Sequence, residues 1–264
     1  MIVLIDVGNT RAKFGWWDDR LGRETQVQAL TLLGEDQPLA SRLHAWLGQF
    51  SRAPVMAYGV SVAASDITAA LENTLLQADI PTRWMRPTAE MLGLTNRYDQ
   101  PSQLGADRWA AMLGVAGRYP QNAMPIILAT FGTATTIDTL GPGSVFEGGM
   151  ILPGPALMRA SLARGTAKLP HVQGSGVAFP RNTQQAISTG VLSAQAGALL
   201  RQCMEVKDMF GVAPRVCTSG GAWSEVEAEV RKNLASIRVD VEHVANPALD
   251  GLARLAAAGV EQAP

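Results

Sequence analysis

Apolar and polar positions over the first 85 residues alternate in short runs typical of strands, interrupted by two segments with helical spacing. The chain opens with an apolar run, a turn containing Gly and Asn, and a second run of β-branched and aromatic residues. Apolar side chains from Leu39 to Leu47 then recur at the period of a helix. The predicted order is βββαβαβ, with strands at 1–6, 11–17, 26–32, 55–60 and 82–85 and helices at 39–47 and 67–77.

The same order of patterns begins again near residue 125. Two runs separated by a turn predict strands at 125–129 and 134–140, and a Gly-Pro-Gly-Ser turn leads into a third strand at 145–152. Apolar residues at helical period indicate a long helix from Thr183 to Phe210. The other predicted elements are helices at 102–118 (the connector between the halves), 155–163, 224–234 and 248–258, and strands at 215–218 and 237–241.

This internal repetition predicts the fold more strongly than any single element does. Strand-turn-strand openings recur at Asp6 and at Thr130, each with a glycine two residues later. Any two hairpins can look alike, but here the order of the later elements repeats as well. We therefore predict an α/β protein made of duplicated ribonuclease-H-like (actin-like ATPase) domains with mixed sheets and an interdomain cleft. The expected domains span residues 1–118 and 119–264.

Composition and charge narrow the classes of function that such a fold could serve. The chain has 264 residues, of which 47% are apolar and 17% charged, enough material for two buried cores. Its net charge is -1 and its Lys and Arg residues are scattered, which gives no general attraction to nucleic acid or to an anionic membrane. No apolar run has the length of a signal-peptide core or a membrane span. We expect a cytoplasmic protein without a nucleic-acid or membrane partner.

The two cysteines, Cys203 and Cys217, lie in apolar or helical contexts. A disulfide framework needs more cysteines, and a zinc site needs a Cys/His spacing that three scattered histidines do not supply. We therefore expect reduced cysteines with a structural role.

The first turn, from Asp6 to Thr10, carries the first chemical signal. A phosphate held in a tight hairpin needs an uncovered backbone, which Gly8 offers, and donors at the rim, which Asn9 and Thr10 offer. Asp6 would repel a phosphate unless a divalent cation lay between them, so we expect it to hold Mg²⁺, through water. An ordinary hairpin turn contains the same residue types, and this segment alone leaves both interpretations open.

Two later turns fit the same chemistry. The segment Gly132 to Thr136 places a glycine and several hydroxyls at the second strand-turn junction, although threonine is also a common strand residue. Ser219-Gly220-Gly221 precedes a predicted helix, where a nucleotide could approach the helix N-terminus closely. The sequence contains neither a Walker A pattern nor a G-x-G-x-x-G pattern, which disfavours the P-loop and dinucleotide-binding folds.

Taken together, these segments resemble the acetate and sugar kinase/actin superfamily and, within it, the type III pantothenate kinases. The resemblance extends over nearly the whole chain, and the combination of Gly-Ala-Asp-Arg, Gly-Thr-Ala and Gly-Gly-x-Ile-x-Pro-Gly is specific to that family. The segments that carry it are Asp6 to Thr10, Tyr98, Leu104 to Arg108, Gly132 to Thr136, Gly148 to Gly154, Asn182-Thr183 and Ser219 to Gly221.

The resemblance implies ATP-dependent phosphorylation of the primary hydroxyl of pantothenate to 4'-phosphopantothenate, the first step of coenzyme A biosynthesis. It implies a homodimer in which both subunits contribute to each pantothenate pocket. It also implies that Asp107 is the catalytic base. The ATP-binding residues that it implies are Asp6, Gly8, Asn9, Thr10, Lys13 and Thr133. The pantothenate-binding residues that it implies are Tyr98, Gly105, Ala106, Asp107, Arg108 and Thr183.

The position of Asp107 agrees with a role as base. Phosphoryl transfer depends mainly on positioning and charge stabilisation, with a carboxylate accepting the alcohol proton. Asp107 lies in the first turn of a predicted helix, where an aspartate commonly stabilises the helix dipole instead. Arg108 could bind an oxygen of the substrate or be a solvated surface residue. Tyr98 could bind substrate or be a half-buried packing residue.

Thr130 departs from the family's pattern. Family members usually carry an aspartate two residues before the second glycine motif, where it helps to hold K⁺ or NH₄⁺. The residue here has no negative charge, so the resemblance leaves dependence on a monovalent cation open.

Two other functions fit the same fold. One is a non-catalytic nucleotide-binding regulatory protein, which would have no need of a base such as Asp107. The other is a kinase for another small alcohol, and the segment from Tyr98 to Arg108 is the part of the chain that distinguishes it.

Overall fold

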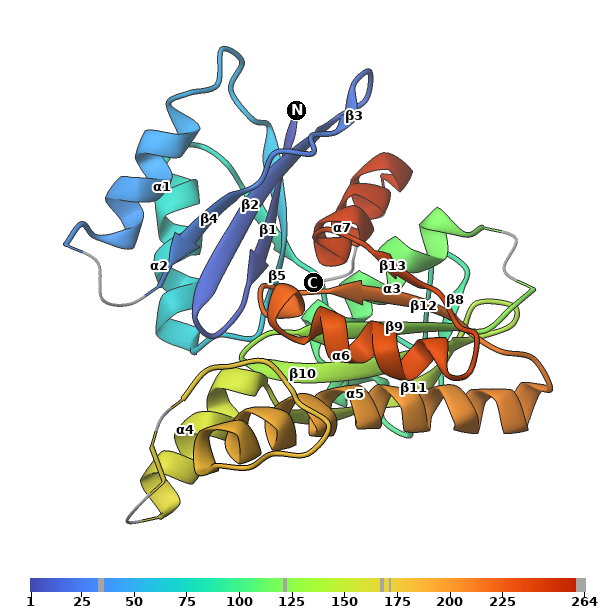
Figure 1. The fold of residues 1–264 in the computed structure, drawn as a ribbon. Helices are drawn as coiled ribbons and strands as arrows, with labels where there is room; N and C mark the ends of the chain where they lie inside the picture. The colour runs from blue at the N-terminus through green and yellow to red at the C-terminus, as the bar shows by residue number, and fades with distance from the viewer. Residues whose placement is uncertain (33–35, 121–122, 167–168, 171, 260–264) are drawn as a thin grey trace. The chain divides into compact units, whose positions relative to one another are not determined.

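A computed structural model describes residues 1–32, 36–120, 123–166, 169–170 and 172–259. The chain forms two compact units, one of residues 1–120 together with 246–264, and one of residues 121–245. Each unit is built around a sheet with helices against it (Figure 1). No helix in the described part of the chain combines the length and the apolar character needed to cross a membrane.

A mixed sheet forms the centre of the first unit. Its strands are β1 (Ile2–Val7), β2 (Arg11–Asp18), β3 (Gly22–Arg23), β4 (Gln28–Thr31), β5 (Met56–Ser61) and β6 (Thr82–Trp84). They run in the order β3-β2-β1-β5-β6, and β4 also pairs with β2. β1 is antiparallel to β2 and parallel to β5, which is in turn parallel to β6.

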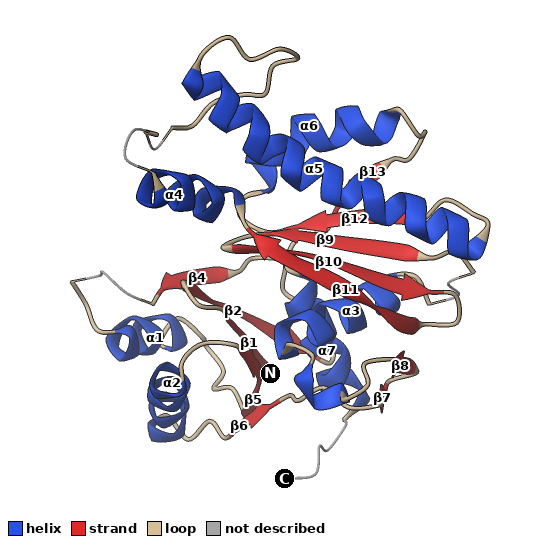
Figure 2. Cartoon of the chain, turned by 90° about the horizontal axis from the view of Figure 1, so that it is seen from below, coloured by secondary structure: helices blue, strands red, loops and turns tan. Residues whose placement is uncertain are grey.

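The two faces of this sheet are covered by different helices (Figure 2). The helices α1 (Leu39–Leu47) and α2 (Ser65–Gln77) pack on the face that carries Val3, Ile5 and Val7 of β1. Successive side chains of a strand point to opposite faces, so Leu4 and Asp6 point to the other one. That face is covered by α3 (Ala106–Arg118) and α7 (Pro247–Ala258). Asp6 thus lies on the same side of the sheet as the helix that carries Asp107.

The helices α3 and α7 are in backbone contact. A Cβ added to Gly251 would lie 1.9 Å from the carbonyl oxygen of Ala110, and one added to Gly114 would lie 2.1 Å from that of Pro247. Only glycine permits this approach. Because of this packing α7 groups with the first unit, whereas the predicted domain boundary assigned residues 119–264 to one domain.

The second unit repeats the plan of the first. Its strands are β9 (Ile126–Phe131), β10 (Ala134–Gly141), β11 (Val145–Pro153), β12 (Arg215–Ser219) and β13 (Val241–His243). They run in the order β13-β12-β9-β10-β11. β10 is antiparallel to β9 and β11, while β12 is parallel to β9 and β13. The relations of β9, β10, β12 and β13 are those of β1, β2, β5 and β6. The predicted duplication of a ribonuclease-H-like sheet is confirmed.

The described part of the second unit contains three helices: α4 (Pro155–Gly165), α5 (Thr183–Phe210) and α6 (Trp223–Ala235). Figure 2 shows α5 and α6 on one face of the sheet. Buried side chains of both helices form the core of this unit with alternate residues of β9, among them Leu199, Val226, Ile127 and Phe131.

Three short stretches differ from the sequence prediction. β3 and the hairpin of β7 (Glu90–Met91) and β8 (Leu94–Asn96) were not predicted, because strands of two or three residues carry too little periodicity. The predicted helix at 102–118 is wrong in its first turn. Residues 101–103 form a 3₁₀ turn, η1 (Pro101–Gln103), and α3 begins after Gly105, whose backbone has φ -58° and ψ 132°.

The predicted strand at 237–241 is also wrong. Ile237 and Val239 are apolar because they pack against the core of the second unit, and their N–H groups donate to the carbonyl of Leu234 at the end of α6. Arg238 between them has φ +58°, which a strand does not allow. The strand begins only at Val241.

Candidate functional site

Asp6 is a half-buried carboxylate near the end of β1. Its partner in the register with β2 is Lys13, so the two side chains share one face of the sheet. Burial raises the pKa of Asp6 to about 6, the Lys13 ammonium opposes this rise, and the negative charge of Asp107 adds to it. Asp6 is therefore a poorly solvated acid whose charged form a bound cation would stabilise.

The turn after β1 is held by its own backbone. The N–H of Gly8 donates to the carbonyl of Arg11 at 3.0 Å, which closes the hairpin. Gly8 therefore contributes an uncovered backbone and not a hydrogen-bond donor. The side chains of Asn9 and Thr10 are exposed at the rim of the turn, where they can reach an anion.

Asp107 is held at the start of α3 by the residues beside it. Its Oδ1 accepts a hydrogen bond of 2.8 Å from the N–H of Arg108. A Cβ on Gly105 would lie 2.7 Å from the same Oδ1, so glycine makes room for the carboxylate. Burial raises the pKa of Asp107, and the N–H and the charge of Arg108 oppose the rise. A half-buried carboxylate with a raised pKa is suited to accept a proton.

Arg108 is a buried part of this site. Its side chain is 6% exposed, so the alternative interpretation as a solvated surface residue is wrong. Nη1 of Arg108 donates to the hydroxyl of Tyr98 at 3.0 Å, and its Cζ lies 5.9 Å from the centre of the Tyr98 ring. The predicted acceptor residues Tyr98 and Arg108 are thus in direct contact, and both follow the short hairpin of β7 and β8.

Asn96 fixes the chain at Tyr98, and sequence reasoning did not identify it. Its side chain is buried, with Oδ1 accepting the N–H of Tyr98 at 3.1 Å and Nδ2 donating to the carbonyl of Thr88 at 3.2 Å. The only signal available was an amide at the end of a short strand, which is common in turns.

In the second unit, the turn after β9 packs against the end of β11. The N–H of Gly154 donates to the carbonyl of Thr133 at 2.9 Å, and a Cβ on Gly154 would lie 2.0 Å from the carbonyl oxygen of Gly132. The side chain of Thr133 is exposed beside this contact. The glycine that ends the Gly-Gly-x-Ile-x-Pro-Gly motif therefore serves to bring two turns together.

The turn after β12 packs against the same place. Gly220 has φ +97°, and a Cβ on it would lie 2.1 Å from the carbonyl oxygen of Phe131. That carbonyl also accepts the N–H of Ala222 at 3.0 Å. Three motifs that are distant in the sequence thus meet in one place, which we name the turn junction; it comprises residues 131–133, 153–155 and 219–222.

Gln195, in α5, holds the turn junction through its side-chain hydrogen bonds. Sequence reasoning did not identify this residue. It is completely buried in α5. Its Oε1 accepts the hydroxyl of Thr135 at 2.5 Å, and its Nε2 donates to the carbonyl of Pro153 at 2.9 Å. A glutamine on the apolar stripe of a helix was the signal that could have identified it.

Thr130 lies among hydroxyl residues. Its register partner on β10 is Thr136, and its partner on β12 is Ser219. Register partners place their side chains on the same face of a sheet, so three hydroxyls lie side by side there, and none of these three positions carries a carboxylate.

Thr183 is the first residue of α5 and is exposed. The residue before it, Asn182, caps the helix by accepting the N–H of Gln185 at 2.9 Å. Thr183 and Thr133 belong to the second unit, whereas the other predicted site residues belong to the first.

The described residues contain no group of three or more His, Cys, Asp or Glu side chains that could hold a metal ion. Asp6 could hold Mg²⁺ together with water and ligand oxygens, which is how Mg²⁺ is commonly held.

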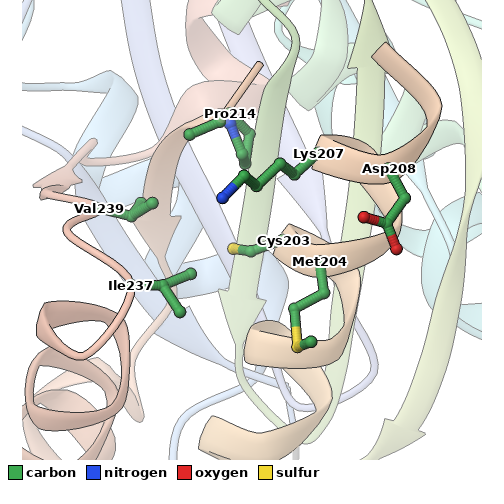
Figure 3. A pocket seen from close by; sticks show the side chains of 8 residues that line it. Cys203, Met204, Lys207, Asp208, Pro214, Ile237 and Val239 are labelled. Carbon is green, nitrogen blue, oxygen red and sulfur yellow. The ribbon is translucent and has the colours of Figure 1, made fainter. Parts of the chain in front are cut away.

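A cavity of about 180 Å³ lies beside the C-terminal part of α5, where Cys203, Lys207 and Val239 line it (Figure 3). No predicted site residue lines this cavity. Cys203 and Cys217 are both buried, and neither forms a disulfide.

Known proteins resemble this chain over nearly its full length. The family model described as type III pantothenate kinase matches residues 2–205. A type III pantothenate kinase of Bordetella petrii is 46% identical over 263 residues, which cover 97% of each chain. Among solved structures, a candidate 2-dehydro-3-deoxygalactonokinase from Sinorhizobium meliloti superposes with a TM-score of 0.60 at 16% identity, covering 98% of this chain and 99% of that one. A candidate Baf family transcriptional activator from Campylobacter jejuni gives a TM-score of 0.57 at 21% identity, covering 97% and 98%. At these identities the two structures support the fold alone.

Proposed function

This chain belongs to the type III pantothenate kinase family, and we propose that it transfers the γ-phosphoryl group of ATP to the primary hydroxyl of pantothenate. The product is 4'-phosphopantothenate, and the reaction is the first step of coenzyme A biosynthesis. The observation that carries the proposal is the pair of carboxylates Asp6 and Asp107, which lie close enough in one unit for the charge of Asp107 to raise the pKa of Asp6. Asp6 is suited to bind a metal ion, and Asp107 is suited to accept a proton.

The ATP phosphates would be bound by the turn after β1. Asn9 and Thr10 supply exposed donors, Gly8 leaves the backbone uncovered, and Lys13 supplies a positive charge on the face that carries Asp6. Thr133 would contact ATP from the turn junction.

Asp6 fits a site for Mg²⁺. Its charged form is poorly solvated, which raises its pKa, and a nearby cation would stabilise that charged form and lower the pKa again. When bound, Mg²⁺ neutralises charge on the phosphates. Without such a cation, Asp6 would repel the nucleotide.

Pantothenate would be bound by Tyr98, Arg108 and the backbone of Gly105 and Ala106, with Thr183 as a further contact. The contact between Arg108 and Tyr98 fixes the direction in which the guanidinium points. Asp107 would accept the proton of the substrate hydroxyl as the phosphoryl group is transferred.

The reaction would need little help from a monovalent cation. Thr130 and its register partners offer oxygens, but no carboxylate is present among them to raise the occupancy of K⁺ or NH₄⁺. The site would therefore bind such an ion more weakly than that of a relative with an aspartate at this position.

The active form would be a homodimer whose pantothenate pockets are completed by both subunits. Small residues lie on the exposed side of α5, and a Cβ added to Gly190 would meet no described atom within 4 Å. Ile151 and Phe179 of the same unit are 64% and 84% exposed, so a partner subunit could cover them. We place the enzyme in the cytoplasm, where its buried thiols stay reduced.

A phosphate-transfer assay tests the proposed function. Purified protein, Mg²⁺ and ATP would be incubated with pantothenate and with a panel of other small alcohols. We expect turnover with pantothenate and little with the other alcohols. Turnover confined to another alcohol would indicate a different kinase, and ATP binding without any turnover would indicate a regulatory nucleotide-binding protein.

A further inference from the structure

An ion pair between a buried arginine and a partly exposed glutamate joins the two helices that leave the turn junction. Nη1 of Arg159, in α4, donates to Oε1 of Glu225, in the first turn of α6. The side chain of Arg159 is 3% exposed and that of Glu225 is 32% exposed. Neither residue is among those that the sequence motifs identified.

The Arg159 end of the pair is tied to one turn. The helix α4 continues directly from the end of β11, because the N–H of Met158 donates to the carbonyl of Gly154 at 2.9 Å. Gly154 is itself bonded to the carbonyl of Thr133. A displacement of α4 at Arg159 would therefore also displace the turn that carries Thr133.

The Glu225 end is tied to the other turn. The N–H of Glu225 donates to the carbonyl of Ala222 at 3.1 Å, and the N–H of Ala222 donates to the carbonyl of Phe131 at 3.0 Å. Phe131 and Thr133 flank the same glycine. Backbone hydrogen bonds thus run from the turn after β9 to both helices, and the ion pair closes the ring between them.

Burying Arg159 in this pair costs free energy of desolvation. Nε and Nη2 of Arg159 are buried and have no hydrogen-bond partner among the described residues. Removing an arginine from water with two donors unpaired costs free energy, and a buried ion pair commonly stabilises a fold no better than apolar side chains of similar volume would. Such a pair does, however, fix relative orientation, because a planar guanidinium and a carboxylate bind in few geometries.

We propose that Arg159 and Glu225 are positioning residues for ATP. They hold the turn of Ser219 to Gly221 and the N-terminus of α6 in register with the turn of Gly132 and Thr133, so that these turns can bind one nucleotide together. The inference rests on the proposed function, since it takes these turns as nucleotide contacts. The two residues act through the turns and need not touch the reacting atoms.

The test replaces both partners at once, since removing one would leave an unpaired buried charge and could prevent folding. In the double variant Arg159→Met/Glu225→Leu we expect a thermal midpoint no lower than that of the parent. We expect KM and Kd for Mg–ATP to rise about tenfold, as misplaced binding groups commonly cause. KM for pantothenate should stay within about twofold, because the acceptor residues are not tied to this pair.

In a second variant, Arg159→Lys with Glu225 unchanged, the positive charge is kept but the planar guanidinium is lost. We expect a Kd for Mg–ATP between those of the parent and the double variant.

The same unit contains a second ion pair that serves as a matched control. Arg215 and Glu242 form an exposed ion pair of 3.8 Å between β12 and β13, and Arg215→Met/Glu242→Leu should leave Kd for Mg–ATP unchanged. An unchanged Kd in the folded Arg159→Met/Glu225→Leu protein would overturn the inference, as would an equal rise in the control. Direct calorimetric binding separates the two proposals. If the parent binds Mg–ATP but phosphorylates no pantothenate, the proposed function fails while the comparison of Kd values still decides this inference.

Discussion

Burial raises the pKa of Asp6 to about 6, and the negative charge of Asp107 adds to that rise. The two acids come from different elements, a strand and a helix that begins a hundred residues later in the chain, and they meet because Asp6 points to the face of the sheet that α3 covers. A pair of acids with perturbed pKa values in one place is typical of an active site.

Asp107→Asn should abolish most turnover and leave ATP binding in place. Asparagine keeps the size of the side chain but cannot accept a proton, so kcat should fall by about 10²–10⁴-fold. The same change removes the charge that raises the pKa of Asp6, so the pKa of Asp6 should fall. Steady-state kinetics and calorimetric titration with Mg–ATP measure the first two quantities. Turnover near that of the parent would remove Asp107 from the mechanism.

Asp6→Asn should stabilise the metal-free protein at neutral pH while weakening metal-dependent use of ATP. The folded-state pKa of about 6 exceeds the ordinary value of 3.8 for an aspartate, so the folded protein binds more protons between those values. The stability contributed by protonated Asp6 is complete below pH 4 and is lost as pH rises through 6. Asparagine does not titrate. A difference of about two pKa units corresponds to about 3 kcal/mol. The variant should therefore match the parent near pH 4 and exceed its thermal midpoint by about 6–12 °C at pH 7.5.

Thermal unfolding in EDTA at several pH values measures this difference, with the exposed Asp208→Asn as the control variant. A lower midpoint for Asp6→Asn at pH 7.5 would mean that burial does not destabilise the charged form.

Gly251→Ala should destabilise the first unit and displace α3. The new methyl group would lie 1.9 Å from a backbone oxygen of Ala110, which cannot move without shifting the helix. Overpacking of this kind commonly costs about 1–3 kcal/mol. Gly197→Ala in α5 meets no described atom within 4 Å and should instead be neutral or slightly stabilising. Denaturant unfolding of the two variants measures the contrast, and equal effects would contradict the close packing of α3 on α7.

Gly190→Leu separates a dimer interface from a free surface on α5. In a monomer the new side chain would point into open space and raise helix propensity, so the fold should tolerate it. In a dimer that uses this face the bulk would separate the subunits and lower activity. Light scattering should show a dimer for the parent and the control Glu227→Leu, and a monomer for Gly190→Leu. A parent mass near 28.0 kDa would contradict the dimer.

Thr130→Asp should create or strengthen a response to potassium. The substitution adds a carboxylate beside the hydroxyls of Thr136 and Ser219, and an anionic ligand raises the occupancy of a cation site. The rate would be titrated with KCl against a tetramethylammonium salt at matched ionic strength. Saturable activation of the parent by low concentrations of potassium would show that Thr130 supports the site without a charge.

The residue pattern alone determined the duplicated order of elements, and the family resemblance added Asp107 as the candidate base. Hydrophobic period identifies strands and helices of ordinary length, and the paired turns at Asp6 and Thr130 mark where each copy begins. The position of Asp107 at the start of a helix could also be predicted. That helix carries an apolar stripe, of which Trp109, Met112 and Leu113 are buried.

Only the tertiary structure decided which distant groups meet. Local pattern does not encode that α7 returns to pack on α3, because that contact depends on two glycines brought together by the path of the whole chain. Ile237 and Val239 were read as a strand because a buried turn and a buried strand both need apolar residues. Arg159 carries no sequence signal, and Gln195 carries only its place on an apolar stripe. A charged or amide side chain in a helix is ordinarily solvated, and only burial against a particular partner makes it part of a site.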